Sequence, residues 1–220
     1  MTDVAPASAL AARLSDLPWV SELWVAGSLA TGDYVPGVSD LDSGAASGTD
    51  LGCVYVDAAR LSDPAALHPT WTHGALVQRI LSGITRAELV RHGFALHGRP
   101  PADVLAPVSD DEVRAAARAE LSGYWAWASR RPWMWLSPVV ADLGLTSMAR
   151  GRHAVATGTL LTKSAAVELA DAPGWLVDQL RARRRGEQVV SPRLRAAWAA
   201  WRDARRTVTA ARRGTPSRAR

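Results

Sequence analysis

Residues 23–42, LWVAGSLATGDYVPGVSDLD, constrain the fold more than any other part of this chain. Residues 23–26 are apolar, which predicts a short buried strand. The strand pattern ends at Gly27 and Ser28, and a glycine has no side chain to keep a ligand away from the backbone. The sequence therefore predicts a junction between a strand and a turn, at which the main chain can approach a polyanion.

Two acidic residues, Asp40 and Asp42, follow this junction, the first of them twelve residues after Ser28. Residues two apart in an extended strand lie on the same face, so the two carboxylates are expected side by side. A cation would relieve their repulsion, and Mg²⁺ suits them because it takes oxygen ligands and completes its shell with phosphates. A glycine turn and a carboxylate pair together favour phosphoryl or nucleotidyl transfer. The alternative is an ordinary turn followed by a surface loop, since each motif alone has a high false-positive rate.

The two motifs at this spacing resemble the signature of the nucleotidyltransferase superfamily. The resemblance implies that Asp40 and Asp42 bind Mg²⁺. It also implies that Gly27, Ser28 and Ser39 contact the nucleotide, which would be ATP.

The chain departs from that family after Asp42. The family continues the strand and adds a helix and another strand, whereas residues 43–48, SGAASG, have the composition of a flexible linker. A strand pattern returns only at residues 51–56, LGCVYV. We therefore expect a shortened strand at the metal site, which makes a nucleotide-binding protein without transfer activity an alternative.

A second motif lies in residues 148–166, MARGRHAVATGTLLTKSAA. Arg150 and Lys163 stand thirteen residues apart, with the tripeptide ATG at residues 156–158 between them. This spacing predicts a helix that carries Arg150 and ends at the glycine, and a new helix with Lys163 in its first turn. A lysine at a helix start is unfavourable unless it binds an anion together with the free N–H groups. The alternative is a pair of solvated charges on a helical hairpin.

This second motif is similar to part of the helical domain of the streptomycin/spectinomycin 3''-adenylyltransferases. Together with the first motif, the resemblance to this family covers about residues 23–185. It implies that Arg150 and Lys163 help to bind the phosphates of ATP and that the acceptor is an aminoglycoside, a small cationic molecule. The family's catalytic glutamate has no counterpart here. His73 is one candidate base, and Asp57 is another candidate base or a third metal ligand. A structural histidine and a turn residue are the alternatives.

The remaining pattern predicts an α+β chain, with a nucleotidyltransferase-like mixed sheet and helices at residues 1–107 and an all-α helical bundle at residues 108–213. Ser109 with Glu112 forms a capping-box pattern at the start of the second domain. Short helices are predicted at residues 10–17 and 86–96, and residues 71–82 fit either a strand or a helix. Residues 214–220 are predicted to be a disordered basic tail.

Charge is distributed unevenly along the chain. The net charge is +5 overall, but residues 181–220 hold thirteen arginines against two acidic residues, and the other 180 residues are net acidic. An acidic body attracts cationic substrates and argues against nucleic acid as the main partner. The rival interpretation is an RNA or DNA binder that uses the arginine-rich C-terminus. A single cysteine and no long apolar stretch predict a cytoplasmic protein without a membrane partner. The protein is expected to be a monomer.

The sequence contains ten tryptophans, and their role is open to two interpretations. Four of them, Trp125, Trp127, Trp133 and Trp135, precede Asp142. Ring faces beside a carboxylate would suit a polyhydroxylated cation, although tryptophans at this spacing also fit the core of a helical bundle. Trp198 and Trp201 are interpreted as a packing stripe next to a solvated face.

Overall fold

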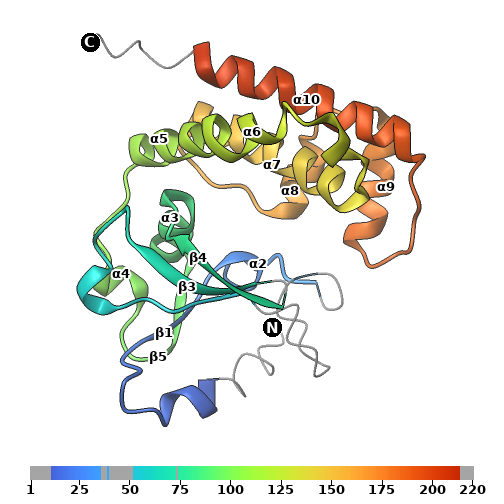
Figure 1. Cartoon of the computed structure of the whole chain (residues 1–220). Helices are drawn as coiled ribbons and strands as arrows, with labels where there is room; N and C mark the ends of the chain where they lie inside the picture. The colour runs from blue at the N-terminus through green and yellow to red at the C-terminus, as the bar shows by residue number, and fades with distance from the viewer. Residues whose placement is uncertain (1–10, 36–38, 40–51, 73, 214–220) are drawn as a thin grey trace. The chain divides into compact units, whose positions relative to one another are not determined.

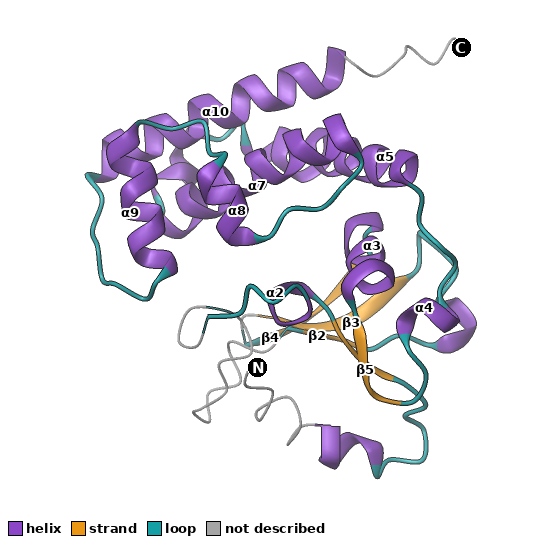
Figure 2. Ribbon diagram, turned by 180° about the vertical axis from the view of Figure 1, so that it is seen from behind, coloured by secondary structure: helices purple, strands orange, loops and turns teal. Residues whose placement is uncertain are grey.

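The computed structural model describes residues 11–35, 39, 52–72 and 74–213 of the 220-residue chain. The chain divides into two compact units, Met1–Val108 and Ser109–Arg220, and Figure 1 labels most of their helices and strands. The fold is α+β, as predicted (Figure 2). The strand pairings of the described residues are all antiparallel, so the mixed sheet expected for the first unit is not found among them. None of the described helices has the length and apolar character needed to cross a bilayer.

The first unit contains two small sheets. Strand β1 (Leu23–Val25) pairs antiparallel with β5 (Phe94–His97), and the order of the second sheet is β2-β3-β4, formed by Cys53–Val54, Leu67–Thr72 and Ala75–Ile80. The ambiguous residues 71–82 are therefore mainly strand. The helix predicted at residues 86–96 is α3 (Gly83–His92), and the prediction was wrong over β5, which pairs with β1 instead.

Short helical segments precede, connect and follow these strands. They are a turn of helix at residues 11–15, α2 (Gly27–Ala30), η1 (Ala58–Arg60) and α4 (Pro101–Val104). Val25 and Leu29 are buried and pack against Ala30, Tyr34, Phe94 and Leu96. This small cluster fixes the start of α2 on the two-stranded sheet, which is where the glycine-serine motif lies.

The second unit is built from helices in its described part. These are α5 (Asp110–Glu120), η2 (Leu121–Trp125), α6 (Ala126–Ala128), η3 (Pro132–Leu136), α7 (Pro138–Thr157), α8 (Lys163–Glu168), α9 (Gly174–Arg184) and α10 (Arg193–Arg213). The predicted capping box opens α5, because the Ser109 hydroxyl accepts a hydrogen bond from the Glu112 N–H and the Glu112 side chain accepts one from the Ser109 N–H. Helix α10 lies along α7 (Figure 2) and contributes a row of buried alanines to the core: Ala196, Ala197, Ala200, Ala204 and Ala211.

Gly158 ends α7, as the ATG motif predicts, in the left-handed conformation with φ of 77°. A Cβ at this position would lie 2.4 Å from the Cβ of Asp110, at the start of α5. Both the backbone conformation and the close approach of α5 therefore require glycine.

Gly158→Ala is expected to lower the free energy of unfolding by about 2 kcal/mol, from left-handed strain and overpacking. Gly174→Ala is the matched control, since Gly174 begins α9 and no described atom lies within 4 Å of an added Cβ. We expect the control to change stability by less than about 1 kcal/mol. Urea unfolding of both variants measures the difference, and equal midpoints would show that Asp110 gives way without penalty.

Candidate functional site

The junction between β1 and α2 has the backbone geometry that the sequence predicts. Gly27 has φ of 72°, a conformation that side chains with a Cβ rarely adopt. The Thr31 hydroxyl donates to the carbonyls of Gly27 and Ser28, at 3.1 and 3.3 Å, and the Asp33 N–H donates to the Ser28 carbonyl at 2.8 Å. A Cβ on Gly27 would meet no described atom within 4 Å. The turn is thus closed by local hydrogen bonds and has open space at its glycine.

Ser39 is held by the loop that follows α2. Its side chain is buried, its Oγ accepts a hydrogen bond from the Val35 N–H at 3.0 Å, and its own N–H donates to the Val35 carbonyl at 2.9 Å. Ser39 therefore fixes the chain immediately before the acidic pair. Asp40 and Asp42, and also His73, lie outside the described residues.

Asp57 caps a short helix. Its exposed carboxylate accepts a hydrogen bond from the Ala59 N–H at 3.0 Å, at the start of η1. This is the turn role weighed above, and a role as base or metal ligand stays a prediction. The described residues contain no group of three or more histidine, cysteine or acidic side chains arranged for a metal ion. Asp40 and Asp42, the predicted metal-binding pair, lie outside the described residues.

His68 is a buried polar residue that the sequence analysis did not single out. It is 2% exposed, and its Nε2 has no hydrogen-bond partner among the described residues. The alternation along β3 is the signal that could have found it, because His68 and Thr70 are the buried residues of this strand. His68 therefore lies inside the unit, and its buried Nε2 does not favour contact with a substrate hydroxyl.

The second motif forms a fixed loop between α7 and α8. Arg150 on α7 donates from its Nε to the Leu161 carbonyl at 3.0 Å, two residues before Lys163. Thr162 caps α8 by accepting a hydrogen bond from the Ala165 N–H at 3.1 Å, which places Lys163 in the first turn as predicted. The structure thus brings the backbone of the Lys163 segment against Arg150.

Further polar contacts hold this loop. The His153 Nε2 lies 2.7 Å from the Thr159 Oγ1, and the hydroxyls of Thr157 and Thr159 are 2.8 Å apart. Arg184, near the end of α9, donates to the Ser164 hydroxyl at 3.1 Å. Arg184 thus places a cation against the first turn of α8. The sequence alone groups it with the basic C-terminus, because nothing local indicates that α9 packs against α8.

The tryptophan cluster divides between core and surface. Trp125 and Trp135 are buried in the core, whereas Trp127 and Trp133 are exposed. Asp142 forms a two-pronged ion pair with Arg183, with distances of 2.6 and 2.9 Å, and burial raises the pKa of its carboxyl group. Because its charge is already matched by arginine, Asp142 does not favour the cation site that the sequence suggested.

Comparison of the chain with protein-family models, with curated proteins and with solved structures gave no match. The nucleotidyltransferase interpretation therefore depends on the residues and local geometry described above.

Proposed function

We propose that this chain is a Mg²⁺-dependent nucleotidyltransferase that moves AMP from ATP to a hydroxyl group of a small cationic acceptor of the aminoglycoside class. The observation that carries the proposal is the junction at Gly27, where a glycine-only backbone conformation and open space follow a strand. Ser39 then anchors the chain directly before Asp40 and Asp42. This is the order of parts that the superfamily resemblance implies.

The donor set suits the metal and the nucleotide. Two carboxylates separated by one residue provide the oxygen ligands that Mg²⁺ shares with substrate phosphates. Bound there, Mg²⁺ would supply neutralisation of the charge that develops on the phosphate. The open backbone at Gly27 and Ser28 would admit the phosphate oxygens. A role of Arg150 and Lys163 in nucleotide binding stays a prediction from the family resemblance.

The proposed reaction needs one base. His73 or Asp57 would take the proton of the acceptor hydroxyl, whose oxygen then forms a bond to the α-phosphorus. The bond from the α-phosphorus to the bridging oxygen breaks at the same time, and pyrophosphate leaves. AMP remains on the acceptor as an ester.

Two measurements on the full chain test the proposal. Calorimetric titration with MgATP is expected to show binding, and addition of streptomycin or spectinomycin is expected to start release of pyrophosphate. Binding without release under either antibiotic would favour the alternative of a family member that binds nucleotide without transferring it. Absence of MgATP binding would contradict both interpretations.

A further inference from the structure

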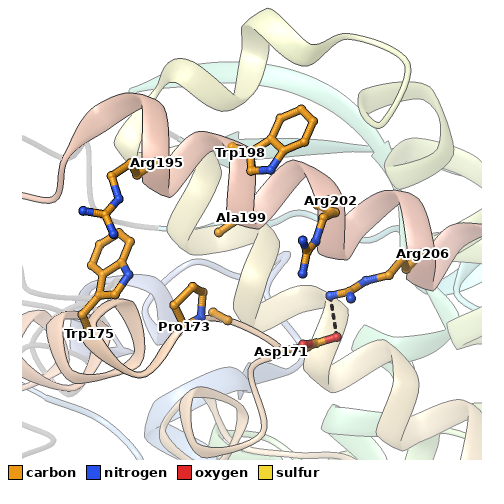
Figure 3. Close-up of a pocket in the computed structure, with 9 residues that line it drawn as sticks. Asp171, Pro173, Trp175, Arg195, Trp198, Ala199, Arg202 and Arg206 are labelled. Carbon is orange, nitrogen blue, oxygen red and sulfur yellow. Dashed lines mark hydrogen bonds and ion pairs between the residues drawn. The ribbon is translucent and has the colours of Figure 1, made fainter.

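The second unit contains a pocket between α10 and the segment that begins α9 (Figure 3). Its volume is about 430 Å³, within the range of small-ligand sites. Trp175 and Asp171 line it on the α9 side, and the α10 side is formed by Arg195, Trp198, Ala199, Arg202 and Arg206. Three arginines face one aspartate, so the pocket has a net positive charge.

Two of these arginines form no ion pair with a described residue. Arg206 pairs with Asp171 at 2.6 Å, as the dashed line in Figure 3 shows. Arg195 lies over the ring of Trp175, 5.1 Å from its centroid, and Arg202 extends toward the same segment. Arg195 and Arg202 have no hydrogen-bond or ion-pair partner within the described part of the chain. Guanidinium groups of this kind are well suited to phosphate, which they can bind with two parallel hydrogen bonds.

An aromatic surface adjoins the two arginines. Trp198 is 59% exposed, although the residue before it on the helix, Ala197, is buried. Trp201, by contrast, is half-buried and donates from its indole nitrogen to the Ser129 carbonyl at 2.8 Å. The packing-stripe interpretation holds for Trp201. Trp198 packs against it, with ring centroids 5.1 Å apart, but keeps most of its own side chain exposed. An exposed indole beside unpaired arginines is the arrangement on which an unstacked base can rest.

The basic row continues beyond the pocket. Arg195, Arg202 and Arg206 are spaced by seven and four residues, so they lie along one exposed face of α10. Arg213, seven residues after Arg206, continues this row. At about 1.5 Å of rise per residue, the row from Arg195 to Arg213 extends about 27 Å. A single nucleotide is shorter than this row, whereas a strand with several phosphates would follow it.

We propose that the exposed face of α10, with Trp198, Arg195 and Arg202 at its centre, binds single-stranded nucleic acid, independently of the transferase activity. The arginines would contact successive phosphates and Trp198 would stack on a base. A duplex hides its base faces, and an acidic peptide would leave the indole without a flat partner. A membrane surface fits less well, because the apolar side of α10 is buried in the unit.

Fluorescence anisotropy with a labelled oligothymidylate of about twelve nucleotides tests this proposal, since single-strand sites cover roughly 4–16 nucleotides. The intact chain is expected to bind, with affinity that falls as salt increases. The double variant Arg195→Ala/Arg202→Ala is expected to weaken binding about tenfold and to reduce the salt slope by about 1.4, at 0.7 per phosphate. Trp198→Ala is expected to weaken binding about tenfold with the slope unchanged, because stacking is not ionic.

A matched control removes the same charge elsewhere in the unit. Arg118 on α5 and Arg130 after α6 lie outside the pocket, so Arg118→Ala/Arg130→Ala is expected to bind like the original chain. Equal weakening by both double variants would show that only net charge matters and would overturn the proposal. Failure of the intact chain to bind, or displacement of the oligonucleotide by an equal concentration of ATP, would also overturn it.

Discussion

Asp40→Asn and Asp42→Asn are each expected to slow pyrophosphate release about a thousandfold, because the loss of several kcal/mol of charge stabilisation corresponds to that factor. Asparagine has nearly the size of aspartate but carries no negative charge, so the change isolates the carboxylate. Initial rates at saturating MgATP and antibiotic measure the effect. Calorimetric titration with MgATP in the same variants should show weaker binding in the presence of the metal.

Asp63→Asn is the control for this pair. Asp63 is an exposed aspartate of the same unit whose carboxylate accepts a hydrogen bond from the Ala65 N–H at 2.9 Å, a contact that asparagine preserves. Its rate is expected to match that of the original chain. If Asp40→Asn and Asp42→Asn released pyrophosphate as fast as Asp63→Asn, the acidic pair would have no part in the reaction.

The parts of the structure that sequence reasoning predicted correctly are set by near neighbours. The cap at Ser109 depends on a residue three positions away, and the glycine at the end of α7 depends on its own backbone conformation. Gly27 belongs to the same group, because an apolar strand followed by glycine indicates a turn. Caps and turns are encoded locally, so a single sequence is sufficient to find them.

The errors come from contacts between distant segments. Residues 94–97 have a pattern compatible with a helix, but they form β5 because β1, about seventy residues earlier, offers an unpaired edge. Trp125 and Trp127 are two positions apart, yet one is buried and the other exposed, because only tertiary packing decides which face of the segment is covered. The periodicity of a segment indicates neither the strand with which it pairs nor the element that covers one of its faces.

The arginine-rich C-terminus shows most clearly that distant contacts decide the role of a residue. The sequence presents one basic block, but the structure separates it into arginines with long-range partners and arginines on an open face. Arg183 pairs with Asp142, which lies 41 positions earlier, whereas Arg195 and Arg202 face the pocket. Deletion of residues 193–220 would also remove the buried alanines of α10, so point substitutions separate binding from folding and truncation does not.

Arg152→Ala is expected to lower the free energy of unfolding by about 3 kcal/mol, because it leaves a buried carboxylate without its cation. Arg152 Nη1 lies 2.6 Å from the Asp203 Oδ1 and 2.6 Å from the Thr207 Oγ1. The side chain of Asp203 is 1% exposed, and one of its oxygens, Oδ2, has no partner among the described residues. Burial raises the pKa of Asp203, while the charge of Arg152 opposes this effect. Urea unfolding at neutral pH measures the loss.

The pH dependence identifies the cause of this loss. Without Arg152, the pKa of Asp203 in the folded state should rise further above its unfolded value, so stability is lost as the pH rises through the folded pKa. The deficit of Arg152→Ala is therefore expected to shrink as the pH falls from about 7 toward about 4, the ordinary value for aspartate. Asp203→Asn added to Arg152→Ala removes the unpaired charge and should recover most of the stability at neutral pH. If the double variant is as unstable as Arg152→Ala at every pH, the loss comes from the packing of the arginine side chain and not from the stranded carboxylate.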